Sequence, residues 1–484
     1  MKETSLPIKF DSTSNGEFVP PVLSVREQQI NQSATEFIYQ QCKYTGMKRR
    51  DFMLSGCGAA ATLLTANQVN AKAGITGGFY QLSADSASDP KVATAELEGN
   101  EYIFDIQGHF VDPNGRWLKD LPESARPFSS LPNTQCDRAD LPGSRSYLQC
   151  LGPEQFIQDV FMDSDTDMMV LSFVPSRRES EPLTIEEAAA TKDIVEKLKG
   201  HQRLLLHGRV NPNQPGDLDG MDELAERWGI NAWKTYTQWG PDGNGFFLTD
   251  EKIGIPFIEK ARKLGVKNIC IHKGIPFGRQ SYEHSLCTDI GVIAKRYPDV
   301  NFIIYHSGFD PSVEETAFAE GAGKAGIDSL VQSVLDAGVK PNNNVYAELG
   351  STWRFLMRHP EQAAHLFGKL IKYVGEDNVL WGTDSIWYGS PQDQIQAFRS
   401  FQISEEFQQK YGYPEMDANL KAKIFGLNAT KPYAIEPAEV QQFLNKDSIA
   451  HGKQNYLNDP QPHFQTYGPK TRREFLNLKK WESV

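Results

Sequence analysis

The sequence predicts an α/β fold, a (β/α)8 TIM-type barrel with loop insertions and extra C-terminal helices. Short apolar runs alternate with amphipathic, helix-like runs from residue 101 onward. Eight of these apolar runs have the length of strands, and several of them end in a histidine or an aspartate. The chain has 484 residues, and barrels of this type exceed the usual size of one domain.

The expected elements follow this alternation in order. We expect strands at 101–109, 168–174, 203–210, 230–237, 266–272, 301–306, 344–349 and 379–384. We expect helices at 184–199, 218–228, 250–264, 282–297, 361–374 and 392–401, with a further helix in an insertion at 311–339. An open doubly wound sheet is the alternative. No glycine-rich phosphate loop follows any of these strands, which disfavours the nucleotide-binding form of that sheet.

The segment 47–73 has the features of an export signal. The paired arginines Arg49 and Arg50 precede an apolar run, and a small-x-small cleavage site follows at 71–73. This order predicts a twin-arginine-like signal peptide and therefore a periplasmic or secreted protein. If 47–73 is an ordinary apolar helix instead, the protein is cytoplasmic.

The flanking segments are assigned from their composition. Residues 1–46 are polar without clear periodicity, and they lie upstream of the true start if translation begins at Met47. Residues 74–100 are small and polar, which indicates a linker. The barrel is then expected at 101–435 and a tail that wraps it at 436–484.

A long insertion is expected at 112–150, where proline, serine and arginine are frequent and periodicity is weak. Such loops over strand ends tend to be functional. Cys136 and Cys150 both lie there, and they could pair as a disulfide after export. The alternative is two free thiols.

Composition limits the range of partners. The formal net charge is −12 and basic residues do not cluster, which argues against binding to nucleic acid. No apolar run approaches the length of a membrane span, so the mature form is expected to lack one. A small molecule is therefore the expected partner. The oligomeric state stays open, with a homo-oligomer as one alternative.

Metal-type ligands stand at the ends of four expected strands. Gln107 and His109 are two residues apart and therefore point the same way along their strand. His272, His306 and Asp384 each end a strand of their own. Because the carboxyl ends of barrel strands meet at the catalytic face, these side chains could converge. Imidazole nitrogens and carboxylate oxygens suit a divalent metal, most of all Zn²⁺.

Each of these residues also has a structural interpretation. A single histidine at a strand end is more often a hydrogen-bonded rim residue than a ligand, and Asp384 could cap the next turn. The joint occurrence in an eight-strand register favours the metal site.

Several motifs resemble the second amidohydrolase family, which includes aminocarboxymuconate-semialdehyde decarboxylase and related hydrolases. The resemblance covers roughly 101–435. It rests on Asp-Ile-Gln-Gly-His-Phe at 105–110, Ile-His-Lys at 271–273, the stretch 297–308, Leu-Trp-Gly-Thr-Asp at 380–384 and Ile-Phe-Gly-Leu-Asn-Ala at 424–429.

The resemblance implies roles for single residues. His109 and His272 would be metal ligands, Asp384 a ligand that also handles a proton, and His306 the catalytic histidine. Gln107 would complete the metal set, but the family usually has histidine or glutamate at this position. A glutamine carbonyl is a neutral and weaker ligand, which puts the identity of the metal and its affinity in doubt.

Cations near the strand ends indicate the substrate. Arg209, Lys234 and Arg354 lie at or just after strand ends, with tryptophans close in sequence. Cations between aromatic walls suit a flat, anionic substrate, whereas the structural alternative is rim solvation. The leading hypothesis is a metal-dependent hydrolase of a small cyclic or aromatic carboxylate. A non-oxidative decarboxylase on the same site and a metal-free ligand-binding barrel are the alternatives.

Overall fold

The barrel is built from one sheet of eight parallel strands whose order in the sheet is their order in the chain. The computed structural model describes residues 6–115, 150–197, 203–277, 281–321, 323–444 and 446–478. The strands are β2 Phe104–Gly108, β3 Met168–Leu171, β4 Leu204–Arg209, β5 Ala232–Tyr236, β6 Asn268–His272, β7 Asn301–Tyr305, β8 Val345–Glu348 and β9 Val379–Leu380.

The last strand returns to the first. The Asp384 amide donates to the Gln107 carbonyl at 3.0 Å, and Gly108 and Ser385 form a parallel bridge. These bonds close the barrel, and the predicted (β/α)8 architecture is confirmed. The eighth strand is shorter than predicted, because the chain leaves extended geometry after Leu380 and turns at Asp384, whose φ is 58°.

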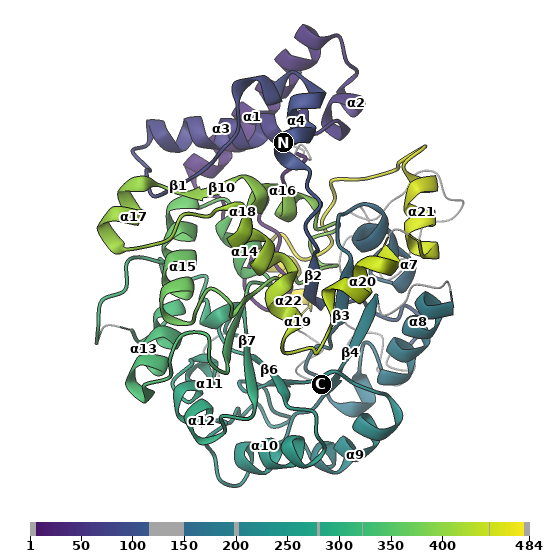
Figure 1. Cartoon of the computed structure of the whole chain (residues 1–484), viewed down its shortest axis with the longest axis vertical. Coiled ribbons are helices and arrows are strands. Elements are labelled where there is room, and N and C mark those ends of the chain that lie inside the picture. Colours follow the sequence, from purple (N-terminus) through teal and green to yellow (C-terminus); the bar gives the residue numbers. More distant parts are fainter. Residues whose placement is uncertain are drawn as a thin grey trace.

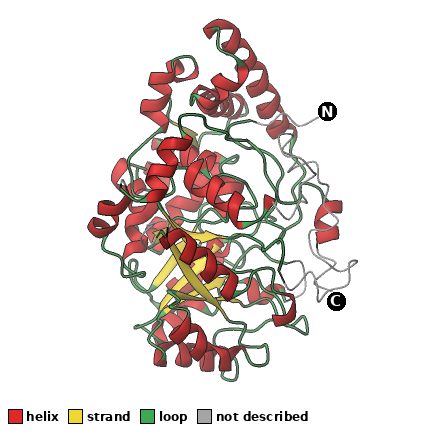
Figure 2. Cartoon of the chain, turned by 90° about the vertical axis from the view of Figure 1, so that its right-hand side faces the viewer, coloured by secondary structure: helices red, strands yellow, loops and turns green. Residues whose placement is uncertain are grey.

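Helices surround the strands on the outside of the barrel (Figure 2). The longer ones are α8 Ile185–Lys197, α9 Asp217–Arg227, α10 Gly254–Lys263, α12 Ile290–Arg296, α13 Ile327–Ala337, α15 Pro360–Tyr373 and α16 Gln392–Ser400. Shorter helices lie in the loops: α7 Pro153–Ile157, η4 Gln158–Met162, η5 Arg178–Ser180, α11 Tyr282–Ser285, η6 His306–Gly308 and α14 Thr352–Leu356. The helix predicted at 282–297 is two helices, because Leu286 has an extended backbone between them.

The interior of the barrel is a packed apolar core rather than a channel. Side chains from successive strands form one buried cluster, which includes Ile106, Val170, Cys270 and Ile303. Tyr433 packs against the same cluster from the C-terminal helices. Layers of inward-facing side chains are typical of this fold, and they place the polar groups at the rim.

Helices before the barrel form an N-terminal module at one end of the molecule (Figure 1). Its elements are α1 Val25–Thr45, α2 Arg49–Leu54, α3 Cys57–Lys72, β1 Gly78–Tyr80, η1 Ala84–Ala87 and α4 Pro90–Leu97. β1 pairs antiparallel with β10 Phe401–Ile403, which follows α16. The segment interpreted from sequence as a linker thus contains β1, η1 and α4.

The segment 47–73 forms α2 and α3 in this structure. Ala60, Leu63 and Ala66 of α3 belong to the same buried cluster as barrel residues such as Trp381. Export through a twin-arginine-like signal stays a prediction. Among the described helices, none has both the length and the apolar character needed to cross a membrane.

The chain after the barrel continues in helices. They are α17 Glu405–Tyr411, α18 Ala418–Ala422, η7 Lys423–Leu427, α19 Asn428–Thr430, α20 Pro437–Leu444, α21 Ser448–Tyr456 and α22 Arg472–Leu478. Arg203, at the start of β4, donates to Asp447 before α21 at 2.6 Å, which holds part of the tail against the barrel. Cys150 is buried and disulfide-bonded. Cys136 lies outside the described residues, so the pairing of Cys136 with Cys150 stays a prediction.

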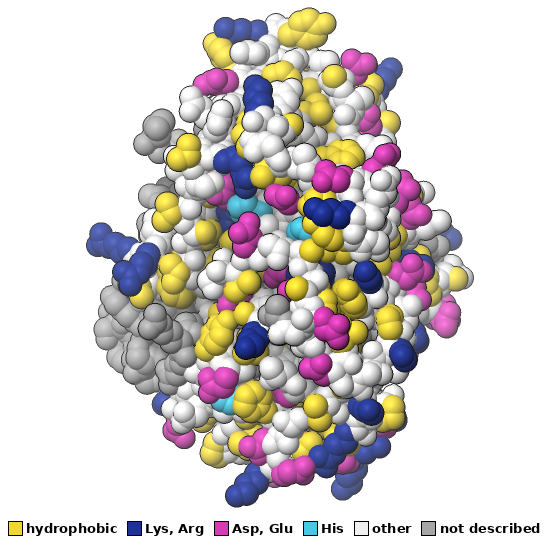
Figure 3. All heavy atoms as spheres, turned by 90° about the vertical axis from the view of Figure 1, so that its left-hand side faces the viewer, with side chains coloured by type: hydrophobic (Ala, Val, Ile, Leu, Met, Phe, Trp, Pro, Cys, Tyr) yellow, Lys and Arg dark blue, Asp and Glu magenta, His cyan; other side chains and the backbone are white. Residues whose placement is uncertain are grey.

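Acidic and basic side chains are interspersed over most of the face shown in Figure 3. The described residues on this face form no extended basic surface, as expected for a chain with a net charge of −12.

Candidate active site

A first group of metal-type ligands gathers where β2 meets the turn after β9. His109 Nε2 lies 3.2 Å from Asp384 Oδ1, and Gln107 Nε2 donates to the same oxygen at 3.0 Å. The two β2 side chains are themselves 3.5 Å apart. The pairing of β2 with β3 shifts its register between Asp105 and Gly108, an irregularity of the kind that often re-aims side chains beside active sites.

The backbone around Asp384 is held in an unusual conformation. Asp384 and Ser351 have left-handed φ angles of 58° and 55°, which cost energy in residues other than glycine. Ser351 Oγ donates to Asp384 Oδ2 at 2.5 Å. Gly382 lies so close to Glu348 that any Cβ there would overlap the carboxylate. These contacts fix the direction in which the Asp384 carboxylate points.

A second group joins β6, β7 and the N-terminal segment. His306 Nε2 lies 3.1 Å from His272 Nδ1. Glu17 Oε1 lies 3.7 Å from His272 Nδ1, and Glu17 Oε2 lies 3.9 Å from His306 Nε2. Both histidines are fully buried, and Tyr236 stacks on His272 with ring centroids 4.7 Å apart. One ligand atom from each of these three residues lies within 4.8 Å of the others, close enough to bind one metal ion.

Asn15 links the two groups. Its side-chain nitrogen donates to Asp384 Oδ2 at 2.8 Å and also to Glu17 Oε2. The site predicted at the strand ends is therefore one continuous polar cluster, and part of it comes from outside the barrel.

Burial shifts the pKa values of several groups here. Burial raises the pKa of the Glu348 carboxyl to about 8, although the His306 amide donates to it and Lys234 lies near. Burial likewise lowers the pKa of the Lys234 ammonium to about 8. Burial also lowers the pKa of the His306 imidazole to about 4, which makes His306 neutral at pH 7.

For Asp384, the neighbouring groups outweigh the effect of burial on the pKa. Burial alone would raise the pKa of its carboxyl, but the adjacent His109, the nearby His306 and the Ser351 hydroxyl hold the pKa below its usual value. Asp384 is therefore ionised at pH 7. An ionised carboxylate beside imidazole nitrogens is a suitable donor set for a divalent cation.

The three cations predicted to bind substrate differ in their surroundings. Arg209 forms ion pairs with Glu181 and Asp217, and Arg354 pairs with Asp11 of the N-terminal segment at 2.6 Å. The Lys234 ammonium has no hydrogen-bond partner among the described residues and lies 3.5 Å from the centre of the Tyr305 ring. Of the three, Lys234 has the charge that protein groups compensate least.

Sequence reasoning missed the contributions of Asn15, Glu17 and Ser351. Ser351 follows the seventh strand by a few residues, and the expectation that functional groups follow strand ends could have found it. Asn15-Gly16-Glu17 has the composition of a turn, which gives no indication of a site 369 residues away at Asp384.

The donor set fits a divalent transition metal. Gln107 Oε1 is buried without a hydrogen-bond partner among the described residues, which leaves one acceptor available beside His109 and Asp384. His109 Nε2 and Asp384 Oδ1 are 3.2 Å apart, close to the separation of about 3.4 Å between ligand atoms that lie about 2.1 Å from a tetrahedral ion. Gln107 directs its amide nitrogen toward both residues, so its amide must turn before its carbonyl oxygen can bind the ion.

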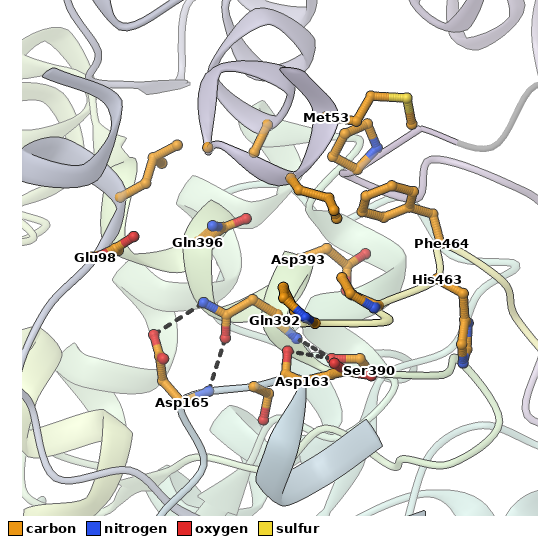
Figure 4. A pocket seen from close by; sticks show the side chains of 18 of the residues that line it. Met53, Glu98, Asp163, Asp165, Ser390, Gln392, Asp393, Gln396, His463 and Phe464 are labelled. Carbon is orange, nitrogen blue, oxygen red and sulfur yellow. Dashed lines mark hydrogen bonds between the residues drawn. The ribbon is translucent and has the colours of Figure 1, made fainter. Parts of the chain in front are cut away.

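A separate cavity of about 250 Å³ lies between the N-terminal module, α16 and the C-terminal tail (Figure 4). Met53, Gln392, Asp393 and Phe464 are among its lining residues. None of the metal-type residues described above lines this cavity, so it is distinct from the candidate site.

Comparison with known families agrees with this fold. A family model described as amidohydrolase matches residues 105–435. Because the match spans more than half of the chain, the protein belongs to the amidohydrolase family. Amidohydrolases are enzymes and are generally metal-dependent. No curated protein matches the sequence.

Several solved structures are similar over the barrel. A 2,6-dihydroxybenzoate decarboxylase from Rhizobium is 15% identical, with a TM-score of 0.38 and coverage of 69% of this chain and 99% of the other. A 4-oxalomesaconate hydratase from Rhodopseudomonas palustris is 16% identical, with a TM-score of 0.39 and coverage of 73% and 99%. A dihydropyrimidinase from Brevibacillus agri is 12% identical, with a TM-score of 0.33 and coverage of 70% and 71%. None of these likenesses assigns a substrate or a reaction to this chain.

Proposed function

We propose that the protein is a metal-dependent hydrolase of a small cyclic or aromatic substrate that carries a carboxylate. The observation that supports this most directly is the buried contact of His109 Nε2 with Asp384 Oδ1 at 3.2 Å, with the Gln107 side chain beside both. Gln107 Oε1 has no hydrogen-bond partner among the described residues, and a divalent cation would satisfy this oxygen together with the imidazole and the carboxylate.

In this proposal Gln107, His109, His272 and Asp384 are the metal ligands, and Zn²⁺ is the best match to their chemistry. When bound, a divalent ion of this kind polarises the substrate and lowers the pKa of a water molecule. Gln107 would present its carbonyl oxygen to the ion, which requires the amide to turn away from its present bond to Asp384.

His306 and Asp384 are the two groups proposed to move the proton. The Nδ1 of His306 lies 2.6 Å from the Gly350 carbonyl, which can only accept, so Nδ1 carries the hydrogen. The Nε2 of His306 is therefore the basic nitrogen, and it faces the site. Asp384 is ionised and receives hydrogen bonds from Asn15 and Ser351, which hold its second oxygen in place.

Lys234 is proposed to bind the substrate carboxylate. Its ammonium is completely buried and has no hydrogen-bond partner among the described residues, so an anionic ligand would satisfy it. Tyr236 and Phe277 stack with ring centroids 6.2 Å apart and offer an aromatic wall beside His272. A flat, anionic molecule matches this combination.

Two other functions remain candidates on specific observations. A non-oxidative decarboxylase would use the same ligands and the same basic histidine, and product analysis separates it from a hydrolase. A metal-free ligand-binding barrel is favoured by the bond from Gln107 to Asp384, which satisfies that carboxylate oxygen without a cation.

Elemental analysis of the purified protein tests the proposal. We expect at least about one divalent ion per chain in the wild type, and its loss in Asp384→Ala and His272→Ala. Asp219→Ala, an exposed change on α9, is the matched control and should retain the ion. A folded wild type that contains no metal and takes up no added Zn²⁺ would instead favour the ligand-binding barrel.

A further inference from the structure

The N-terminal segment 6–18 contributes a carboxylate to the candidate site. Glu17 lies before the N-terminal module and outside the residues 105–435 that the family model matches. Its carboxylate nevertheless faces the buried imidazoles of His272 and His306. A residue far from the barrel in sequence therefore completes the cluster of His272 and His306.

This segment is firmly anchored, so the position of Glu17 is defined. Asp11 pairs with Arg354 at 2.6 Å, and the Thr13 and Thr466 hydroxyls are 2.7 Å apart. The Ser14 amide donates to the Pro469 carbonyl at 2.9 Å. Ile8 and Phe10 belong to the main buried cluster, which fixes the start of the segment. Phe18, directly after Glu17, belongs to the same buried cluster, so Asn15-Gly16-Glu17 is anchored on both sides.

The hydrogen bonds of the two histidines determine which ring nitrogens carry hydrogen. His306 donates from Nδ1 to the Gly350 carbonyl at 2.6 Å, which leaves a lone pair on Nε2. In the tautomer with its hydrogen on Nε2, His272 can donate to the Ile275 carbonyl at 3.4 Å and keeps a lone pair on Nδ1. Two lone pairs then face each other across 3.1 Å, with a carboxylate beside them. A cation between these atoms would remove their mutual repulsion.

The distances favour a metal ion over a shared proton. A proton bridges only the two nitrogens at 3.1 Å, and the Glu17 separations of 3.7 and 3.9 Å are longer than hydrogen bonds. Ligand atoms about 2.1 Å from a tetrahedral ion lie about 3.4 Å apart, and the N–N separation of 3.1 Å and the N–O separations of 3.7 and 3.9 Å fall on either side of that value. Two imidazoles and one carboxylate also form a common ligand set for zinc.

We propose that Glu17 is a metal ligand, supplied by the N-terminal segment, which completes a divalent-metal site with His272 and His306. The inference rests on the proposed metal-dependent function and extends its ligand set. It also revises the role proposed above for His306: an ion bound to Nε2 would occupy the basic nitrogen, which leaves Asp384 as the group that moves the proton.

The test measures Zn²⁺ affinity of the full-length chain by competition with a chromophoric chelator. Glu17→Gln keeps the size of the side chain and removes its charge, and we expect it to weaken Zn²⁺ binding at least about tenfold. His306→Asn should weaken binding to a similar extent. Glu36→Gln on the exposed face of α1 is the matched control and should bind as the wild type does.

A Co²⁺-substituted protein gives a second readout that is independent of turnover. Its visible absorption reports the ligands, and we expect a changed spectrum in Glu17→Gln and an unchanged one in Glu36→Gln. Circular dichroism verifies that each variant is folded, and Glu17→Asp provides a variant with the charge retained. The Glu17→Asp variant should recover part of the Zn²⁺ affinity that Glu17→Gln loses.

The outcomes separate this inference from the proposed function. If the wild type binds Zn²⁺, Asp384→Ala loses it, and folded Glu17→Gln binds it with unchanged affinity and spectrum, then Glu17 is not a ligand and this inference alone fails. A rise in turnover in that variant without a change in metal binding would identify the segment as an obstruction instead. A wild type without affinity for metal overturns the proposed function as well.

Discussion

The side-chain nitrogen of Asn15 lies 2.8 Å from Asp384 Oδ2, which joins the N-terminal segment to the proposed catalytic carboxylate. Both groups are buried, and Asn15 also donates to Glu17. The amide therefore keeps two carboxylates next to each other without direct repulsion. The site depends on residues that precede the barrel as well as on the barrel itself.

Asn15→Ala should destabilise the protein and loosen Asp384. A buried hydrogen bond to a charged group contributes roughly 1.5–3 kcal/mol, so we expect a loss of about that size in the free energy of unfolding. Denaturant titration measures it. Asn455→Ala on exposed α21 should leave the free energy within about 0.5 kcal/mol of wild type. Equal stability of the Asn15 variant and the wild type would show that the bond contributes little.

Gln107→His should strengthen metal binding. An imidazole nitrogen is a better ligand for zinc than a neutral amide oxygen, so we expect Zn²⁺ affinity to rise about tenfold or more. Chelator competition measures the change, with Gln40→His on the exposed face of α1 as the matched control. An affinity unchanged from wild type would show that the side chain at 107 does not touch the ion.

The stability of the protein should depend on pH through Glu27, which lies in the first turn of α1. Burial raises the pKa of its carboxyl, but His359, Arg358 and Ser24 outweigh that effect and lower the pKa to about 2. Because the folded-state pKa lies below the ordinary value, this contribution is present above about pH 4.5 and is lost as pH falls toward 2.

The variant Glu27→Gln isolates that contribution. We expect it to be less stable than the wild type at pH 6, by on the order of 2 kcal/mol, and the difference to shrink at pH 3. Denaturant titration at both values measures it. A difference that is the same at pH 3 and pH 6 would exclude the electrostatic explanation.

The twin-arginine prediction is tested by replacing Arg49 and Arg50 with lysine. Both side chains are exposed, so the fold should be unaffected, whereas export through that pathway should fail. Cell fractionation measures the location, and Arg472→Lys with Arg473→Lys on α22 is a matched exposed pair. Unchanged location in the Arg49 and Arg50 variant would end the export hypothesis.

The barrel could be predicted from the sequence because its strands and helices are encoded by patterns among neighbouring residues. Apolar runs such as 301–306 and 266–272 match β7 and β6 closely, and the alternation with helices fixes their order. His272 and His306 could be placed at strand ends for the same reason. Asp384 was expected at the end of a strand, but a turn delivers it, since β9 ends at Leu380.

The remaining part of the site depends on pairings between distant residues. Arg354 was expected to bind substrate, yet Asp11 neutralises it across 343 residues of chain. Glu17 was not considered, because it lies in an irregular segment before α1 that has no period to reveal which side chains face a core. Long-range ion pairs of this kind leave no trace in a local pattern.

The anchoring of residues 6–18 has a consequence for protein synthesis. Thr13 pairs with Thr466 across 453 residues, and Ser14 bonds to the Pro469 carbonyl. The segment that carries Glu17 is made first, but its binding partners leave the ribosome hundreds of residues later. Helices and neighbouring strands can form as they emerge, because their contacts are local. The full set of contacts that holds the carboxylate at position 17 is complete only after residue 470 has been added, so an interrupted chain would lack part of this anchoring.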